Sequence, residues 1–414
     1  MKRLTALLLA LIMLMPMLYG CGGTNRLDAV IILPGIMGSE LFLEEDTVFD
    51  GKEYKADAKL WLALDSVKQV FAVPEHISML DPSAGCNIQT ESPIVNYYHS
   101  RQTYGTLNTY KELYLALYNE FGKKCDVVFY SYDWRMDPYE SARELDEFVK
   151  SQGYKRISIV AHSMGGLVAS HYFAMGEEQR GRIHTYLSLG TPYLGSEEAA
   201  YAMITGNIDS FFANIIVSNE ARELCPRIDS MYALLPYRHL WQSTLSVYSL
   251  TGKAASDSFE AEQILLQEYI DNYSPERHNT AEAKKERLFT KDGRHVTELV
   301  NSYYLVGDGE KTAVGINVPN DVRLSSTVTT RTKESAGDGT VSLYSATAGG
   351  TLPEDRVFIK TGGDGFLADH KSLANGNDRT TLDFIIAVLR GKAKSYSRRQ
   401  LKNTYNIKQG GETE

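Results

Sequence analysis

The segment from Arg156 to Ala169 constrains the fold of this chain more than any other stretch. An apolar run, Ile157 to Ala161, leads into His-Ser-Met-Gly-Gly, and a second apolar run extends from Leu167 to Met175. This order predicts a buried strand, a sharp turn and a helix, with Ser163 at the apex of the turn. A hydroxyl at that point stands beside a helix N-terminus, whose free N–H groups favour a developing negative charge. The sequence therefore predicts that Ser163 is a nucleophile.

The motif around Ser163 is a variant of Gly-x-Ser-x-Gly, with Ala161 in place of the first glycine. Small residues are needed two positions before and after the serine because the strand and the helix nearly touch at this turn. Alanine meets that requirement. Serine and glycine between a strand and a helix are often only a turn. The flanking strand and helix, more than the motif itself, carry the prediction.

Length and charge exclude some classes of protein. A chain of 414 residues can bury the core of one large domain with insertions. The net charge is −9, and no basic cluster lies outside the extreme N-terminus. A surface that tracks phosphates is therefore not expected, and we predict no nucleic-acid partner.

The N-terminus has the pattern of an export signal. Lys2 and Arg3 precede an apolar run from Leu4 to Leu18, which ends in Leu-Tyr-Gly-Cys. This pattern predicts a lipoprotein signal peptide over residues 1–20, with Cys21 as the lipidated N-terminus of the mature protein. An uncleaved signal anchor is the alternative. Either form would be exported, and we expect a lipid anchor at the outer face of a bacterial cell membrane, followed by a spacer over residues 21–28.

The other cysteines do not form a metal-binding pattern. Cys86, Cys125 and Cys225 lie at no metal-ligand spacing, and the sequence has no His-Glu-x-x-His run. We expect neither a metal nor another cofactor. One disulfide and one free thiol are possible, but the spacing selects no pair.

A second buried strand is predicted by the continuous apolar run Ala29 to Leu33. The glycine-bearing loop Pro34 to Ser39 follows it directly. A backbone N–H on such a loop can hold an oxyanion, and we assign this N–H to Ile36, with Met37 as the alternative. An ordinary turn at the end of a strand is the competing interpretation.

The remaining segments predict one α/β domain over residues 29–390, with a mostly parallel sheet flanked by helices. Two stretches lose the alternation of strand and helix and are predicted to be a lid insertion, about 41–106, and a cap insertion, about 196–297. Within the cap, the charged run Glu276 to Arg287 is expected to be a solvated helix face. A polar tail follows at 391–414. Strands are predicted at 126–130, 185–189, 302–306 and 356–360, and helices at 110–121 and 138–152.

A serine nucleophile needs a general base, and His370 is the best-placed histidine. It ends a glycine-rich loop, Gly362 to Asp369, after the last predicted core strand. His184 begins a strand and faces the wrong end, and His162 is expected to point away from the nucleophile beside it. The predicted cap contains His239, His278 and His295.

Two aspartates are candidates for the carboxylate that orients the base. Asp308 directly follows a predicted strand, and Asp338 lies on a later glycine-flanked turn. Flanking glycines let the backbone turn an aspartate inward, although Gly-Asp-Gly is also a common plain turn. Position in the sequence barely separates the two.

Together these segments resemble the lecithin:cholesterol acyltransferase family, which includes phospholipid:diacylglycerol acyltransferases and the lysosomal A-type phospholipase. The matching pieces span nearly the whole predicted mature chain in the right order, and their combination is specific. They are LPGIMGSEL at 33–41, LWLAL at 60–64, YDWR at 132–135, AHSMGGL at 161–167, GTPYLGS at 190–196, GDGTV at 337–341, and His370.

The resemblance implies an α/β-hydrolase fold in which Asp338 is the acid of a triad with Ser163 and His370. Ile36 occupies the family's oxyanion-loop position and Met164 the other donor position. Trp61 lies in what resembles the lid region. A small disulfide closes that lid in relatives, but only Cys86 lies nearby here.

The implied activity is hydrolysis or transfer of lipid acyl groups through an acyl-serine, with a lipid substrate at a membrane surface. A carboxylesterase or peptidase that uses the same triad on soluble substrates is the alternative. A catalytically silent binding lipoprotein is a further one. The sequence does not select the acyl acceptor.

Overall fold

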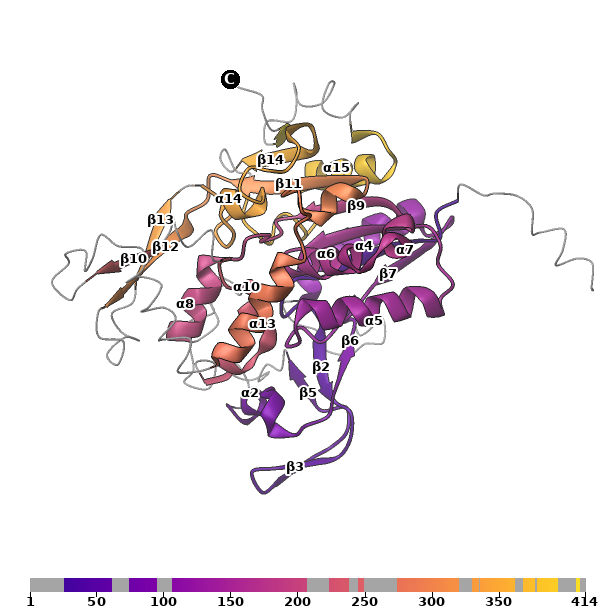
Figure 1. Ribbon diagram of the computed structural model, residues 1–414. Coiled ribbons are helices and arrows are strands. Elements are labelled where there is room, and N and C mark those ends of the chain that lie inside the picture. Colours follow the sequence, from indigo (N-terminus) through magenta and orange to yellow (C-terminus); the bar gives the residue numbers. More distant parts are fainter. Residues whose placement is uncertain are drawn as a thin grey trace, which may run out of the picture.

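A central sheet of seven strands, in the order β15-β14-β11-β9-β8-β1-β7, organises the molecule (Figure 1). The computed structural model describes residues 26–61, 74–94, 106–206, 223–237, 245–248, 274–319, 330–334, 336–361, 368–376, 378–393 and 407–409. All neighbouring strands pair in parallel except β14 and β15, which are antiparallel. The strands are β1 (Ala29–Leu33), β7 (Asp126–Phe129), β8 (Ile157–His162), β9 (Ile183–Leu189), β11 (Ser302–Asp308), β14 (Val357–Thr361) and β15 (Ile407–Gln409).

The predicted core strands are confirmed, and β1 shows why a strand inside the sheet can be apolar throughout. Ala29, Ile31 and Leu33 belong to the core on one face of the sheet, and Val30 and Ile32 belong to the core on the other. Successive side chains of a strand point to opposite faces, so a strand covered on both faces needs apolar residues at every position.

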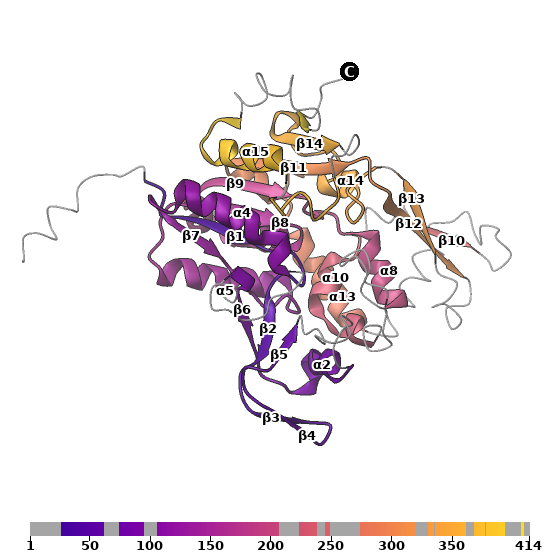
Figure 2. The same ribbon diagram turned by 180° about the vertical axis from the view of Figure 1, so that it is seen from behind.

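Helices cover both faces of the sheet. One face carries α5 (Pro138–Ser151) and α6 (Met164–Met175), and the other carries α4 (Thr106–Phe121) and α15 (Arg379–Leu389), which Figure 2 shows from behind. The helix α6 is buried from Met164 to Phe173, which explains its apolar sequence. The sequence analysis predicted α4, α5 and α6 but not α15.

The order of the strands places a switch point between β1 and β8. From β1 the chain moves to β7 at the edge, and from β8 onward it moves in the opposite direction through β9, β11 and β14. Ligands of open parallel sheets bind at the carboxyl ends of the strands at such a point. The loops after β1 and β8, which contain Ile36 and Ser163, both begin there.

The predicted lid region contains small antiparallel sheets that the sequence analysis missed. One consists of β2 (Glu40–Leu43), β5 (Lys59–Trp61) and β6 (Ile88–Glu91), and a hairpin is formed by β3 (Thr47–Phe49) and β4 (Lys52–Tyr54). These sheets lie below the central sheet in Figure 1. The strands are too short, and too mixed in polarity, to give a period-two signal. Two short helices, α2 (Pro74–Met79) and η1 (Pro82–Ala84), complete the described part of this region.

The predicted cap region is mainly helical where it is described. Outside the predicted cap, the helix α7 connects α6 to β9, and β12 and β13 form a separate sheet with β10 of the cap. Bounds are α7 (Glu177–Gly181), α8 (Glu197–Thr205), η2 (Cys225–Arg227), α10 (Asp229–Leu234), β10 (Leu245–Tyr248), α13 (Pro275–Glu286), η3 (Val296–Leu299), β12 (Thr312–Pro319), β13 (Thr330–Glu334), α14 (Leu343–Ala346) and η5 (Glu354–Arg356).

The expectation of a solvated helix at 276–287 is wrong for one face of α13. His278, Ala281, Glu282 and Lys285 are buried. The Lys285 ammonium donates to the carbonyl of Leu235 at 2.7 Å and lies 3.0 Å from the Glu282 carboxylate. Charged side chains can be buried when they are paired and hydrogen-bonded, so the charge of this segment hid its packing face.

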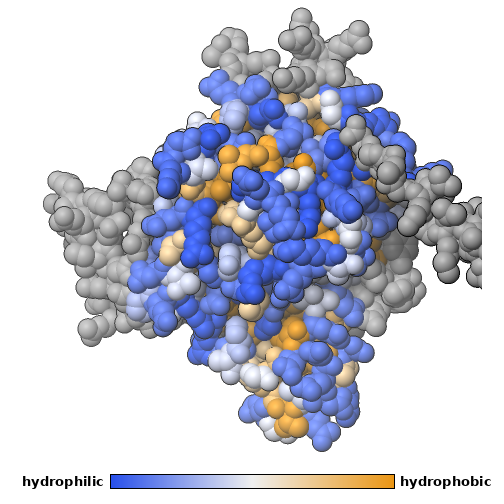
Figure 3. All heavy atoms as spheres, turned by 45° about the vertical axis from the view of Figure 1, so that its right-hand side comes forward, coloured by the Kyte–Doolittle hydropathy of each residue, from blue (hydrophilic) through white to orange (hydrophobic). Residues whose placement is uncertain are grey.

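The surface in Figure 3 is mostly hydrophilic, with hydrophobic residues gathered in one patch in the upper half and in another toward the lower end. The β3–β4 hairpin lies at that end of the molecule in Figure 1, and its Val48 is 71% exposed. A single exposed valine is normal for a soluble domain. No helix among the described residues, which do not include the predicted signal segment, is long and apolar enough to cross a membrane. Cys86, Cys125 and Cys225 are free thiols.

Candidate active site

Ser163 lies at a strained turn between β8 and α6. Its backbone has φ 53° and ψ −127°, a region that residues with a side chain seldom adopt. Its N–H donates to the carbonyl of Leu189 in β9 at 2.9 Å, and its side chain makes no helix-capping hydrogen bond. Such strain persists only where the surrounding structure imposes it, and it is found at functional sites. The local structure matches the predicted strand, turn and helix.

The small residues of the motif are explained by close packing around this turn. A Cβ atom on Gly165 would lie 2.6 Å from the carbonyl oxygen of Pro34. A Cβ atom on Gly35 would lie 2.8 Å from the Cβ of Ser163 and 3.3 Å from its hydroxyl oxygen. The loop after β1 therefore passes directly beside Ser163. This contact places the predicted oxyanion loop against the predicted nucleophile.

The loop after β1 is held by aromatic residues from distant segments. The Tyr132 hydroxyl donates to the carbonyl of Pro34 at 2.6 Å, and the Trp61 indole N–H donates to the carbonyl of Met37 at 3.0 Å. Met37 has a positive φ of 62°. Trp61 is 4% exposed and packs edge-on against Trp134 at 5.2 Å between ring centroids. Trp61 is thus buried and contacts the loop after β1 through its indole N–H.

The Ile36 side chain is 9% exposed, and Met164 is the first residue of α6. The N–H groups of a helix's first turn have no partner within the helix and can bind an anion, which is the basis for assigning Met164 as a donor. The assignment of these two N–H groups as oxyanion donors stays a prediction.

Asp338 and His370 meet directly. The Nδ1 of His370 lies 2.7 Å from Oδ2 of Asp338, and the backbone N–H of His370 donates to the carbonyl of Asp338 at 2.8 Å. The other carboxylate oxygen of Asp338 accepts from the N–H groups of Thr340 and Val341 at 3.1 and 2.8 Å. The Asp338 carboxylate is 1% exposed, so these hydrogen bonds fix its position and the orientation of the imidazole.

The structure brings Asp338, and not Asp308, to the imidazole. Asp308 is the last residue of β11 and is partly exposed. The chain leaves the sheet after Asp308, forms β12 and β13, and returns so that Asp338 lies beside Gly307. A Cβ atom on Gly307 would lie 2.6 Å from the Cβ of Asp338. Sequence position could not separate the two because this return is a tertiary feature.

The His370 ring also lies against the turn that holds Ser163. His162 precedes Ser163, and its ring centroid is 4.7 Å from that of His370. Gly190 follows Leu189, the hydrogen-bond partner of Ser163, and a Cβ atom on it would lie 3.2 Å from Nδ1 of His370. The His370 Nε2 is buried and has no hydrogen-bond partner among the described residues. It therefore makes no hydrogen bond to the Ser163 hydroxyl in this structure, and its lone pair is free to accept a proton.

Two of the other candidate histidines hydrogen-bond to neighbouring residues. His184, at the start of β9, accepts a hydrogen bond from Arg156 at 2.7 Å. His295 caps η3 and lies 2.9 Å from the Thr297 hydroxyl. His278 is buried on α13, and His239 lies outside the described residues.

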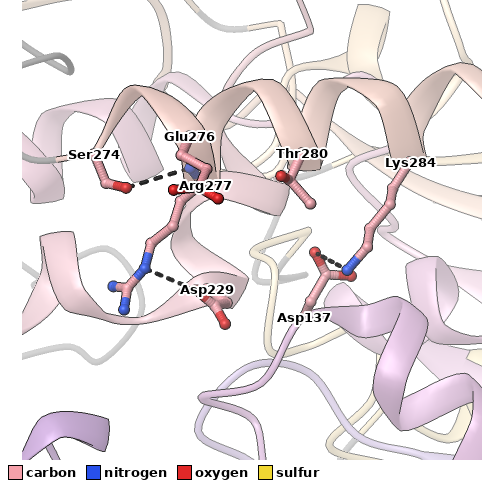
Figure 4. Close-up of a pocket in the computed structure, with 7 residues that line it drawn as sticks. All are labelled: Asp137, Asp229, Ser274, Glu276, Arg277, Thr280 and Lys284. Carbon is pink, nitrogen blue, oxygen red and sulfur yellow. Dashed lines mark hydrogen bonds and ion pairs between the residues drawn. The ribbon is translucent and has the colours of Figure 1, made fainter.

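A separate polar cavity of about 350 Å³ lies where α13, α10 and the start of α5 meet (Figure 4). Arg277 lies 3.3 Å from the Asp229 carboxylate, and Lys284 lies 3.3 Å from that of Asp137. Two ion pairs thus lie within this cavity. The described residues contain no cluster of three or more histidine, cysteine or acidic side chains that could hold a metal.

A family model described as lecithin:cholesterol acyltransferase matches residues 59–312, more than half of the chain. The chain belongs to this family. Membership indicates an enzyme that acts on lipid esters, by hydrolysis or by acyl transfer. Ser163 lies inside the matched range, whereas Asp338 and His370 lie beyond it. A comparison with curated protein sequences gives no match.

The chain has an α/β-hydrolase fold, and of two solved structures that resemble it the first supports a shared fold. The structure of a Tle4–Tli4 complex matches with a TM-score of 0.58 at 14% identity, over 90% of this chain and 99% of the other. Phospholipase PlaB from Legionella pneumophila matches with a TM-score of 0.37 at 16% identity, over 71% of this chain and 59% of its own. At these identities the likeness to Tle4–Tli4 concerns the fold alone.

Proposed function

We propose that this protein is a serine-dependent lipid acyl hydrolase or O-acyltransferase that works through an acyl-serine intermediate. The observation that carries the proposal is the buried Asp338–His370 pair beside the strained turn of Ser163. Family membership supports the lipid class of the substrate.

In the first step, the Ser163 hydroxyl oxygen attacks the carbonyl carbon of the lipid ester while its proton moves to Nε2 of His370. Asp338 accepts the Nδ1–H of His370 and stabilises the imidazolium. The N–H groups of Met164 and Ile36 hold the negative oxygen. The bond to the leaving alcohol then breaks, and His370 returns its proton to that oxygen.

In the second step, water or a lipid hydroxyl attacks the acyl-serine. His370 takes the proton of the attacking group, the ester bond to Ser163 breaks, and the serine oxygen recovers a proton from His370. Water gives a free fatty acid, and a lipid alcohol gives a new ester.

The decisive variant is Ser163→Ala, which leaves the fold and removes the attacking oxygen. We expect it to abolish burst-phase acylation of a nitrophenyl ester and labelling by a fluorophosphonate probe. The matched control is Ser158→Ala, in the strand β8 that leads to Ser163, whose buried hydroxyl has no partner among the described residues. Full turnover by Ser163→Ala would show that the proposal is wrong, and an unlabelled wild-type protein would indicate a silent binding protein.

The lipid substrate class is tested separately. Labelled phospholipid vesicles are incubated with the enzyme, with and without a lipid alcohol, and the products are identified by mass. A rate increase on vesicles and with longer acyl chains is expected for the lipid enzyme. Activity confined to short soluble esters or peptides would favour the alternative.

We also propose that the protein is exported and held at the membrane through lipid on Cys21. The charged start, apolar run and terminal Leu-Tyr-Gly-Cys support this proposal. Intact-mass measurement of the mature protein should give a chain that begins at Cys21 and carries lipid. A mass that includes residues 1–20 would exclude cleavage.

A further inference from the structure

His162, the residue before Ser163, occupies the centre of a buried hydrogen-bond chain. Its Nε2 lies 3.0 Å from the backbone carbonyl oxygen of His370, and its Nδ1 lies 2.9 Å from the Tyr110 hydroxyl. The Tyr110 oxygen in turn accepts the backbone N–H of Gly35 at 2.8 Å. His162 is 5% exposed and Tyr110 is 3% exposed. The chain thus joins the loop after β1 to the loop that carries His370.

The direction of every hydrogen bond in this chain follows from its ends. A carbonyl oxygen can only accept, so Nε2 of His162 carries a hydrogen and donates to His370. Burial holds the pKa of His162 well below its ordinary value, so the ring is neutral and Nδ1 accepts from Tyr110. The Tyr110 oxygen is then free to accept from Gly35. One tautomer of His162 satisfies all the groups.

We infer that His162 is a positioning residue, which couples the base His370 to the oxyanion loop through Tyr110. The inference rests on the proposed function. His370 is held at three points: its imidazole by the Asp338 carboxylate, its N–H by the Asp338 carbonyl, and its carbonyl by His162. The third contact fixes the peptide plane that follows the base. It comes from the residue bonded to the nucleophile, so the nucleophile and the base share one rigid frame.

The contact between Tyr110 and the loop after β1 was not predicted from the sequence. Tyr110 lies in α4, on the opposite side of β1 from α6, yet its hydroxyl reaches the loop that passes Ser163. Its ring packs edge-on against His162 at 5.7 Å between centroids. The sequence analysis predicted that His162 points away from the nucleophile. Its ring nitrogens do bond to groups other than Ser163, namely the Tyr110 hydroxyl and the backbone carbonyl of His370.

Three variants of the full chain test the inference on a soluble nitrophenyl ester. His162→Leu keeps volume and removes both hydrogen bonds, His162→Gln keeps an amide N–H near the position of Nε2–H, and Tyr110→Phe removes one oxygen. We expect kcat to fall on the order of 100-fold in His162→Leu, the factor that a small misplacement of a reacting group can cost. KM should change little, and the acidic limb of the kcat/KM profile against pH should shift. His162→Gln should have a kcat roughly tenfold higher than that of His162→Leu.

The double variant Tyr110→Phe/His162→Leu is the sharpest comparison. If the chain acts as a unit, Tyr110→Phe adds little once His162 is replaced. The inference is overturned if the two losses multiply, or if His162→Gln and His162→Leu are equally active. Urea unfolding of each variant separates loss of fold from loss of positioning. If His162→Leu does not fold, the activity of Tyr110→Phe tests the inference by itself. Ser163→Ala is measured alongside. If Ser163→Ala remains active, the proposed function fails. If Ser163→Ala is inactive but the His162 and Tyr110 variants are as active as the wild type, this inference alone fails.

Discussion

Trp61 is buried against the loop after β1, and this location indicates a structural role. The sequence analysis placed it in what resembles the lid region, and the structure packs it against the loop after β1, with its indole N–H donating to the carbonyl of Met37. A hydrogen bond to the carbonyl of a residue with positive φ holds that residue in its strained conformation. Trp61 therefore stabilises the loop that is proposed to supply an oxyanion donor.

We expect Trp61→Phe to lower the free energy of unfolding by about 1 kcal/mol through the lost hydrogen bond, in addition to the cost of lost volume. It should also lower kcat, because the loop is less firmly held. Trp134→Phe is the matched control, since its buried indole N–H has no partner among the described residues. Denaturant unfolding and steady-state kinetics measure both variants. A change confined to KM or chain-length preference would instead support a direct substrate contact by Trp61.

The elements that carry the acid and the base approach each other across β11. Gly307 near the end of β11 lies between the turn of Asp338 and the loop that leads to His370. A Cβ atom there would lie 2.6 Å from the Cβ of Asp338 and would also meet the carbonyl oxygen of Ala368. The packing of two loops on one strand, and no property of either loop alone, therefore sets the distance between acid and base.

Gly307→Ala should force these loops apart. We expect kcat to fall on the order of 100-fold, by misplacement of the base, and stability to fall by about 1–3 kcal/mol through overpacking. Gly181→Ala, at the end of α7, is the control because its Cβ would meet nothing within 4 Å. Kinetics and urea unfolding distinguish them, and equal activity of the two variants would contradict the argument.

For the molecule as a whole, buried histidines link folding to pH. Burial lowers the pKa of His171 to about 3, with a smaller effect of Lys284 and Arg287, and burial lowers that of His295 to about 3. An unfolded histidine has a pKa of about 6.5. Between these values the unfolded chain binds more protons than the folded one, so stability falls as pH falls.

Stability should therefore be fully present above about pH 6.5 and should fall toward pH 5 by up to about 1.4 kcal/mol per pH unit for each histidine. Urea unfolding at pH 7, 6 and 5 measures this slope, in a range above the titration of most carboxylates. His171→Phe removes one titrating group and should reduce the slope. An unchanged slope in this variant would show that His171 does not contribute.

The sequence by itself determined six of the seven strands of the central sheet and the apex serine, because apolar runs and the elbow motif are local properties of consecutive residues. It missed β15, which lies in the predicted polar tail and pairs with β14. It also put His370 first among the histidines, and the resemblance selected Asp338. Only the tertiary structure decided which aspartate meets the imidazole, where Trp61 lies and what His162 contacts. Those contacts join residues far apart in the chain, such as Tyr110 and Gly35 or His162 and His370. Their formation depends on how the loops return to the carboxyl ends of the sheet, and no local pattern of residues encodes that return.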